Sequence, residues 1–215
     1  MYRLNFLKFI AFFTICLAAC DGSRAARPSL PGTQTSLRSF SETPRELREL
    51  HSILVGEVQV DGSAHGCALG LDLTKELMGA FSREVGVELV IDKEASKHAL
   101  AHGALASRAD ALGASAVLYT TLKSCERRLG SRIGVEDPAA VGMSFVLVRA
   151  SDGKEIWRAD YLNRDQALSE NLLKLEERIS NPGWRSAEQL FVGGLTLAAR
   201  DLEQKRQEQF LGAVK

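Results

Sequence analysis

The passage that decides the fold reads ADALGASAVL and spans residues 109–118. It ends an Ala-rich stretch, 94–112, whose composition favours a helix, and it opens a strand over 114–122 that contains Val117, Leu118 and Tyr119. Gly113 stands between the two, where a glycine can end a helix in a left-handed conformation. The passage therefore predicts a helix that leads directly into a core strand.

Upstream of this passage the chain alternates between strand and helix patterns. A short helical stretch at 45–50 precedes a predicted strand at 53–60, which Asp61-Gly62-Ser63 ends. Residues 69–85 place apolar side chains at the spacing of one helix face, and 87–91 is a short β-branched run. The order up to residue 122 is therefore strand, helix, strand, helix, strand.

Downstream, the pattern predicts a polar loop over 123–140 and then a hairpin. Its strands, 143–149 and 155–162, flank the turn dipeptide Asp152-Gly153. Two amphipathic helices are expected after it, at 165–179 and 184–207. The predicted fold class is α/β (α+β), with a single mixed sheet in the order β-α-β-α-β-β-β, followed by carboxyl-terminal helices.

The amino terminus carries the clearest motif, Leu17-Ala18-Ala19-Cys20. It follows the basic residues Arg3 and Lys8 and an apolar run over 9–19, which is the layout of a signal peptide. The four residues resemble the lipobox of bacterial lipoproteins, in which the cysteine receives diacylglycerol and becomes the first mature residue. The apolar run has 11 residues, against the roughly 20 that a membrane-spanning helix needs.

The motif predicts three segments: a lipoprotein signal peptide at 1–19, a flexible tether at 20–44 and a single α/β domain at 45–215. The tether is rich in Ser, Thr, Pro, Gly and Arg, so it is not expected to form a core. An ordinary cleaved signal with a coincidental cysteine is the alternative. Two or three acyl chains on Cys20 would hold the protein stably on a bilayer. Asp21 resembles an inner-membrane retention signal of some bacteria, and the choice between inner and outer membrane stays open.

Composition narrows the function classes. The 27 basic residues balance 27 acidic ones, which gives no indication of a nucleic-acid partner. The apolar fraction of 45% is typical of a globular protein. Neither figure points to a particular partner.

Four cysteines fall to three after cleavage, and acylation of Cys20 leaves Cys67 and Cys125 as free side-chain thiols. If the strands before the loops 61–68 and 123–138 are parallel, both loops leave the sheet at the same carboxyl edge and the two cysteines come close. Two alternatives stay open: a disulfide between them, or two buried, unpaired cysteines.

The passage 109–118, the hairpin segment 152–157 and the helix start at 184–190 together resemble a group of small envelope domains. These are the amino-terminal domain of TolB, the curli secretion lipoprotein CsgG and the LpoB-type activators of penicillin-binding proteins. The resemblance covers about residues 54–202, and Trp157 within it is expected to anchor the sheet against a helix. It implies a domain without catalytic activity that docks on another envelope protein or assembles with its own copies. The pore-forming strands of CsgG have no convincing counterpart here.

The histidines and nearby ligand-type residues are the candidates for a catalytic or metal site. His98 and His102 lie one helical turn apart, but two ligands are too few for a zinc site. His65, Asp61 and Cys67 place ligand types close together without a recognised metal spacing. This 61–68 loop is the basis of an alternative function, a hydrolase or metal-dependent enzyme. No catalytic residue, metal ligand or cofactor is assigned.

The predicted loop 123–140 carries the basic residues Lys123, Arg127, Arg128 and Arg132. They form a candidate surface for an acidic partner or headgroup, with an ordinary solvated loop as the alternative. The expected function is that of a non-enzymatic accessory or regulatory lipoprotein of the bacterial cell envelope. It would face the periplasm, bind the bilayer through Cys20 and contact an envelope protein. A self-assembling structural subunit is the remaining alternative.

Overall fold

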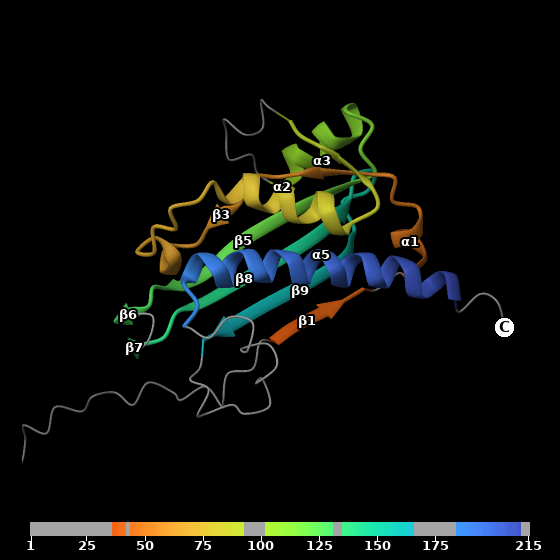
Figure 1. The fold of residues 1–215 in the computed structure, drawn as a ribbon. Coiled ribbons are helices and arrows are strands. Elements are labelled where there is room, and N and C mark those ends of the chain that lie inside the picture. Colours follow the sequence, from red (N-terminus) through yellow and green to blue (C-terminus); the bar gives the residue numbers. More distant parts are fainter. Residues whose placement is uncertain (1–35, 42–43, 93–101, 131–134, 166–183, 212–215) are drawn as a thin grey trace, which may run out of the picture. The chain divides into compact units, whose positions relative to one another are not determined.

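The computed structural model describes residues 36–41, 44–92, 102–130, 135–165 and 184–211, all within one compact unit, Thr33–Lys215. The elements follow the order that the sequence predicts, with additional strands at 36–40, 129–130 and 135–137 (Figure 1). In chain order they are β1 (Ser36–Phe40), α1 (Pro44–Arg48), β2 (Ser52–Val55), β3 (Gln59–Val60), the short 3-10 helix η1 (Gly62–Ala64), α2 (Leu73–Glu84), β4 (Glu88–Val90), α3 (His102–Ala111), β5 (Ala116–Glu126), β6 (Leu129–Gly130), β7 (Val135–Asp137), β8 (Ala140–Arg149), β9 (Glu155–Arg164) and α5 (Ala187–Leu211).

A seven-stranded mixed sheet organises the fold, and β6 and β7 form a separate two-stranded antiparallel sheet that the prediction of a single sheet lacked. Its order is β1-β9-β8-β5-β2-β4, and β3 pairs with β5 beyond the end of β2. Strand β2 runs parallel to both β4 and β5, whereas β5, β8, β9 and β1 pair antiparallel. The mixed α/β fold predicted from the sequence is confirmed.

The two faces of the sheet carry different cores. On one face, α2 and α5 lie side by side (Figure 1) and pack on residues such as Leu118 and Phe145. On the other, α3 covers a smaller cluster that includes Val117 and Tyr119. The alternation of Val117, Leu118 and Tyr119 along β5 supplies both faces, because successive side chains of a strand point to opposite sides.

Trp157 of β9 connects the sheet to α5. Its side chain is fully buried, and its ring centroid lies 6.4 Å from that of Phe145. The indole Nε1 donates a hydrogen bond of 3.0 Å to Asp201 of α5, and the Ser39 hydroxyl donates to the same carboxylate at 2.8 Å. The aromatic anchor expected at this position is confirmed.

Helix α5 approaches the sheet most closely at Gly194. A Cβ atom at this position would lie 2.3 Å from Met143 Cε and 2.5 Å from the Tyr161 ring. Only a residue without a side chain fits there. Gly194 therefore sets how closely helix and sheet pack.

The two predicted turn glycines have the expected conformation. Gly113 and Gly153 both have a φ of 70°, in the left-handed region that favours glycine. Gly113 ends α3, and Gly153 closes the turn between β8 and β9.

The predicted tether 20–44 is wrong at its carboxyl end. Residues 36–40 form β1, which pairs along its whole length with β9 at the edge of the sheet. Leu37 packs against the main core, and Ser39 bonds to Asp201 of α5; backbone pairing with β9 holds the strand along its length. Residues 20–35 of the tether and the signal segment lie outside the described residues.

Two further boundaries differ from prediction. The predicted strand 53–60 is interrupted after Val55, and the Val58 amide donates to the Thr74 hydroxyl of α2 instead of a strand. The predicted loop 123–140 contains several strand segments. Strand β5 continues to Glu126 alongside β8 past a bulge between Leu122 and Ser124, and β6 pairs with β7. Residues 166–179 of the predicted helix 165–179 lie outside the described residues, as do residues 94–101 of the earlier helix.

Candidate functional sites

The structure joins Cys67 and Cys125 in a disulfide. The two Cα atoms lie 5.5 Å apart, within the ordinary range for such a bond. Both residues belong to the main core. The bond links the segment after η1 to the far end of β5, at the edge where the parallel strands were expected to bring them together.

The 61–68 loop does not assemble the enzyme site considered from the sequence. In the disulfide, Cys67 has no thiol left to act as nucleophile or ligand. Asp61 is exposed and lies 3.9 Å from the Lys123 ammonium, and His65 is exposed. Within the described ranges, no group of three or more His, Cys, Asp or Glu residues could hold a metal ion. His102 begins α3, and His98 lies outside these ranges.

The three candidate basic residues that the structure describes do not form one free patch. Lys123 lies in β5 and not in a loop. Arg128 donates to the carbonyl oxygen of Trp184. Arg127 and Arg128 also help to lower the pKa of Glu188 on α5, although the hydrogen bond with Ser186 is the main cause. Arg132 lies outside the described residues.

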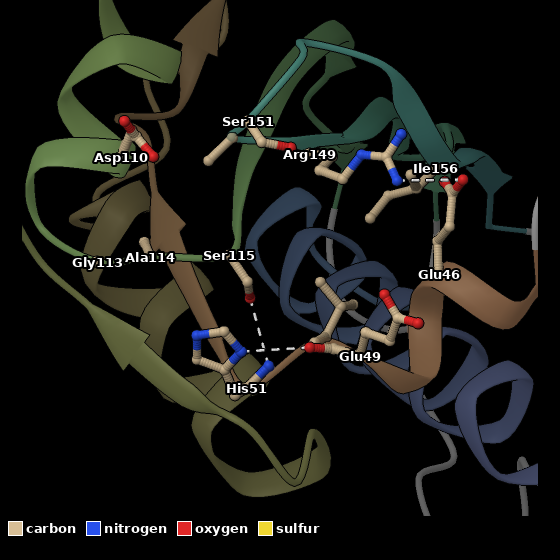
Figure 2. Close-up of a pocket in the computed structure, with 12 residues that line it drawn as sticks. Glu46, Glu49, His51, Asp110, Gly113, Ala114, Ser115, Arg149, Ser151 and Ile156 are labelled. Atoms are coloured by element: carbon tan, nitrogen blue, oxygen red, sulfur yellow. Dashed lines mark hydrogen bonds and ion pairs between the residues drawn. The ribbon is translucent and has the colours of Figure 1, made fainter.

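A hollow at the opposite end of the sheet is a candidate site that the sequence did not reveal. Its volume is about 350 Å³, and its walls come from segments far apart in sequence (Figure 2). The polar lining residues are Glu46, Glu49, His51, Asp110, Ser115, Arg149 and Ser151; Leu50, Ala114 and Ile156 supply apolar surface.

Ion pairs occupy one wall of this hollow. Arg149 donates two hydrogen bonds to Asp152 and lies 3.2 Å from Glu46, which also lies 3.6 Å from Lys154. The hydrogen bonds from Arg149 are the main reason that the pKa of Asp152 falls from 3.8 to about 2. The Asp152 interaction also raises the pKa of Arg149. The guanidinium of Arg149 is therefore already satisfied by carboxylates of this chain.

Hydrogen bonds fix the base of the hollow, where β2 and β5 begin. The Ser115 hydroxyl donates to the carbonyl of Ser52 at 2.5 Å and accepts from the backbone amide of His51 at 3.3 Å. The Ser52 hydroxyl in turn donates to the carbonyl of Gly113. These bonds connect the end of α3 to the start of β2 and hold His51 in place.

Comparison with solved structures supports the fold. A variant of PelC from Paraburkholderia phytofirmans, solved as a dodecamer, matches 79% of this chain and 99% of its own, with a TM-score of 0.52 and 12% identity. A second PelC dodecamer from the same organism has the same TM-score, at 13% identity and 98% coverage of its own chain. The lipoprotein GNA1162 from Neisseria meningitidis aligns at a TM-score of 0.38, with 20% identity over 61% of this chain and 96% of its own.

At these identities the PelC likeness shows a shared fold and nothing further. No family model and no curated protein matches the chain. The resemblance to the TolB, CsgG and LpoB-type domains stays a prediction. Among the described helices, none combines the length and apolar character needed to cross a membrane.

Proposed function

We propose that this chain is a lipid-anchored lipoprotein of the bacterial cell envelope that acts as a non-enzymatic accessory or regulatory protein through protein contacts. The bilayer holds it through acylated Cys20, and the α/β domain meets an envelope protein on the periplasmic side.

Two separate features carry this proposal, because both indicate that the chain is exported from the cytoplasm. The segment 17–20 has the pattern of a lipobox, which predicts export and acylation. The Cys67–Cys125 disulfide belongs to the folded core, and disulfides persist in oxidising compartments such as the periplasm. The PelC likeness supports the fold on which the proposal rests.

Fatty-acid labelling tests the anchor directly. The full chain, expressed in a bacterium grown with an alkyne fatty acid, should take up the label and sediment with membranes. Cys20→Ala should lose both properties, because it removes the acylated sulfur. Cys16→Ala is the matched control, since it removes the other signal-segment cysteine and should keep the label. Labelling of Cys20→Ala at the level of the natural sequence would refute the anchor.

Self-assembly is the second candidate function, and the PelC likeness favours it. Both PelC structures are described as dodecamers, and each aligns over nearly its whole length. Sedimentation velocity of the full chain in detergent over a range of concentrations tests this candidate. A discrete species of several chains would support a structural subunit. A monomer throughout would leave only the accessory role.

A further inference from the structure

The seven-stranded sheet ends in two edge strands, β1 and β4. Within the described residues, β1 pairs only with β9 and β4 pairs only with β2, so each has one side without a neighbouring strand. An edge of this kind presents backbone N–H and C=O groups to which another chain can add a strand. Large apolar side chains lie exposed at both edges, Phe40 in β1 and Ile91 directly after β4, with exposed fractions of 59% and 58%.

The hydrogen bonds of β9 show which backbone groups of β1 point outwards. The N–H and C=O groups of one strand residue point to the same side, and those of the next residue point to the other. The Asp165 N–H donates to the carbonyl of Ala139 beside β8, so odd-numbered residues of β9 face β8 and even-numbered ones face β1. Arg38 is the register partner of an even-numbered residue and therefore bonds to β9. Leu37 and Ser39 direct their backbone groups to the open side.

The edge at β4 has a matching set of groups. The Glu88 N–H donates to the carbonyl of His51, next to β2, so Glu88 faces β2 and Leu89 directs its N–H and C=O outwards. The strand pairings make β1 and β4 antiparallel to each other. A rotation about an axis parallel to the strands keeps their directions, so β1 of one copy meets β4 of a second copy as an antiparallel pair.

One register of this pair matches backbone, apolar and charged groups together. It sets Leu37 opposite Leu89, and the backbone groups of both residues point outwards, so they can exchange two hydrogen bonds. Both side chains pack against the main core of their own chain, so they lie on the same face of the joined sheet. Arg38 then lies opposite Glu88 on the other face. Their pair has no backbone hydrogen bonds, and in such pairs the Cα atoms are about 4.5 Å apart and the side chains are closest.

Charge favours this pairing of unlike edges. Arg38 and Glu88 are both exposed, and neither makes a side-chain hydrogen bond or ion pair with the described residues. Opposite charges on facing strands attract, whereas like charges directly opposite are destabilising. Full antiparallel pairing of two β1 strands would set Arg38 against Arg38 of the second copy. The charges therefore direct β1 of one copy to β4 of another.

We propose that copies of this chain assemble head to tail by strand addition, with β1 of one copy paired to β4 of the next and Arg38 opposite Glu88. Contacts of this type build closed rings or open filaments. The inference rests on self-assembly, the second candidate function. A chain that stays monomeric would remove both. Assembly that is indifferent to the charges at positions 38 and 88 would overturn this interface and leave self-assembly intact.

The test is sedimentation velocity of the full chain in detergent over a range of concentrations. Arg38→Glu and Glu88→Arg each set like charges opposite, so each should raise the concentration at which half of the chains are assembled by about tenfold or more. An equimolar mixture of the two variants should assemble as the natural sequence does, because each contact between unlike variants again joins a Glu to an Arg.

Lys75→Glu and Glu57→Arg are the matched controls, because both residues are exposed and belong to neither edge strand. They should leave assembly unchanged. Near-ultraviolet circular dichroism of each variant checks that the buried Trp157 keeps its environment, and recovery in the mixture shows independently that both variants fold. Assembly of either folded edge variant at the concentration of the natural sequence would overturn the interface. A mixture that assembles no better than its two components would also overturn it.

Discussion

The two faces of the sheet differ in what covers them. Under α2 and α5 lie large, fully buried side chains, among them Phe81, Phe145 and Trp157. The opposite face has one small cluster beneath α3, and along β9 it presents exposed Arg158 and Asp160. Most of the apolar burial, and therefore most of the hydrophobic stabilisation, belongs to the first face. Beyond the small cluster beneath α3, the exposed positions of the second face should tolerate substitution at little cost to folding.

The largest expected effect comes from Trp157→Ala on the helix-covered face. Removing a fully buried aromatic side chain leaves a cavity, and Asp201 loses its indole donor. We expect the free energy of unfolding to fall by about 3–5 kcal/mol, measured by urea denaturation. Val146→Ala, at a half-buried position on the other face, should cost less than about 1.5 kcal/mol. Equal losses would contradict the difference between the faces.

The disulfide is the next largest contribution. Its loop spans 58 residues, and the chain-entropy model gives roughly 4 kcal/mol for a loop of that length. Cys67→Ser combined with Cys125→Ser should lower the free energy of unfolding by about that amount. The natural sequence measured with a reductant should move towards the same value. A double variant as stable as the oxidised protein would show that this cross-link does not stabilise the fold.

Alanine substitutions at Gly194 and Gly193 each add one methyl group to α5 and test how closely this helix approaches the sheet. Gly194→Ala would push a Cβ into the Tyr161 ring, so we expect a loss of about 1–3 kcal/mol. A Cβ atom on Gly193 would meet no other atom within 4 Å. Gly193→Ala should therefore stabilise the helix by about 0.5–1 kcal/mol. Thermal denaturation would show melting temperatures that move in opposite directions, and a shared direction would contradict the packing described.

The smallest effect belongs to the open side of β9. Arg158 pairs with Glu155 at 2.6 Å, and its side chain is 49% exposed. Surface ion pairs contribute little because water and salt screen them. Arg158→Ala should change the free energy of unfolding by less than about 0.5 kcal/mol in urea denaturation. A loss above about 1.5 kcal/mol, the range of a buried truncation, would show that this face stabilises the fold as the helix-covered face does.

The parts of the fold that could be predicted are those whose structure depends on residues close together in the sequence. Gly113, Gly153 and the alternation along β5 identify the central strand and its hairpin, because their conformation depends on neighbouring residues. Strand β1 was missed because residues 36–40 have few apolar side chains, and pairing with β9 decides their structure. The extension of β5 was missed because Lys123 and Ser124 look like a loop until β8 is seen beside them.

The candidate sites also differ in whether the sequence could predict them. Parallel order of the strands was enough to predict that Cys67 and Cys125 would approach each other. The hollow could not be predicted, because Glu49, Asp110 and Arg149 come from three separated segments with no shared motif. The positions of these residues in the sequence do not indicate that they line the same hollow. Only the register of the sheet, which pairs Ile53 with Ala116 and Ala116 with Arg149, brings those segments together.

The central claim is that the anchored chain works by contact with an envelope protein. The most direct test is crosslinking in intact cells, followed by purification of the acylated chain and mass spectrometry, with the Cys20→Ala variant alongside. We predict one discrete envelope partner that is strongly reduced with Cys20→Ala. Recovery of the acylated chain alone, as a monomer without a crosslinked partner, would contradict the claim.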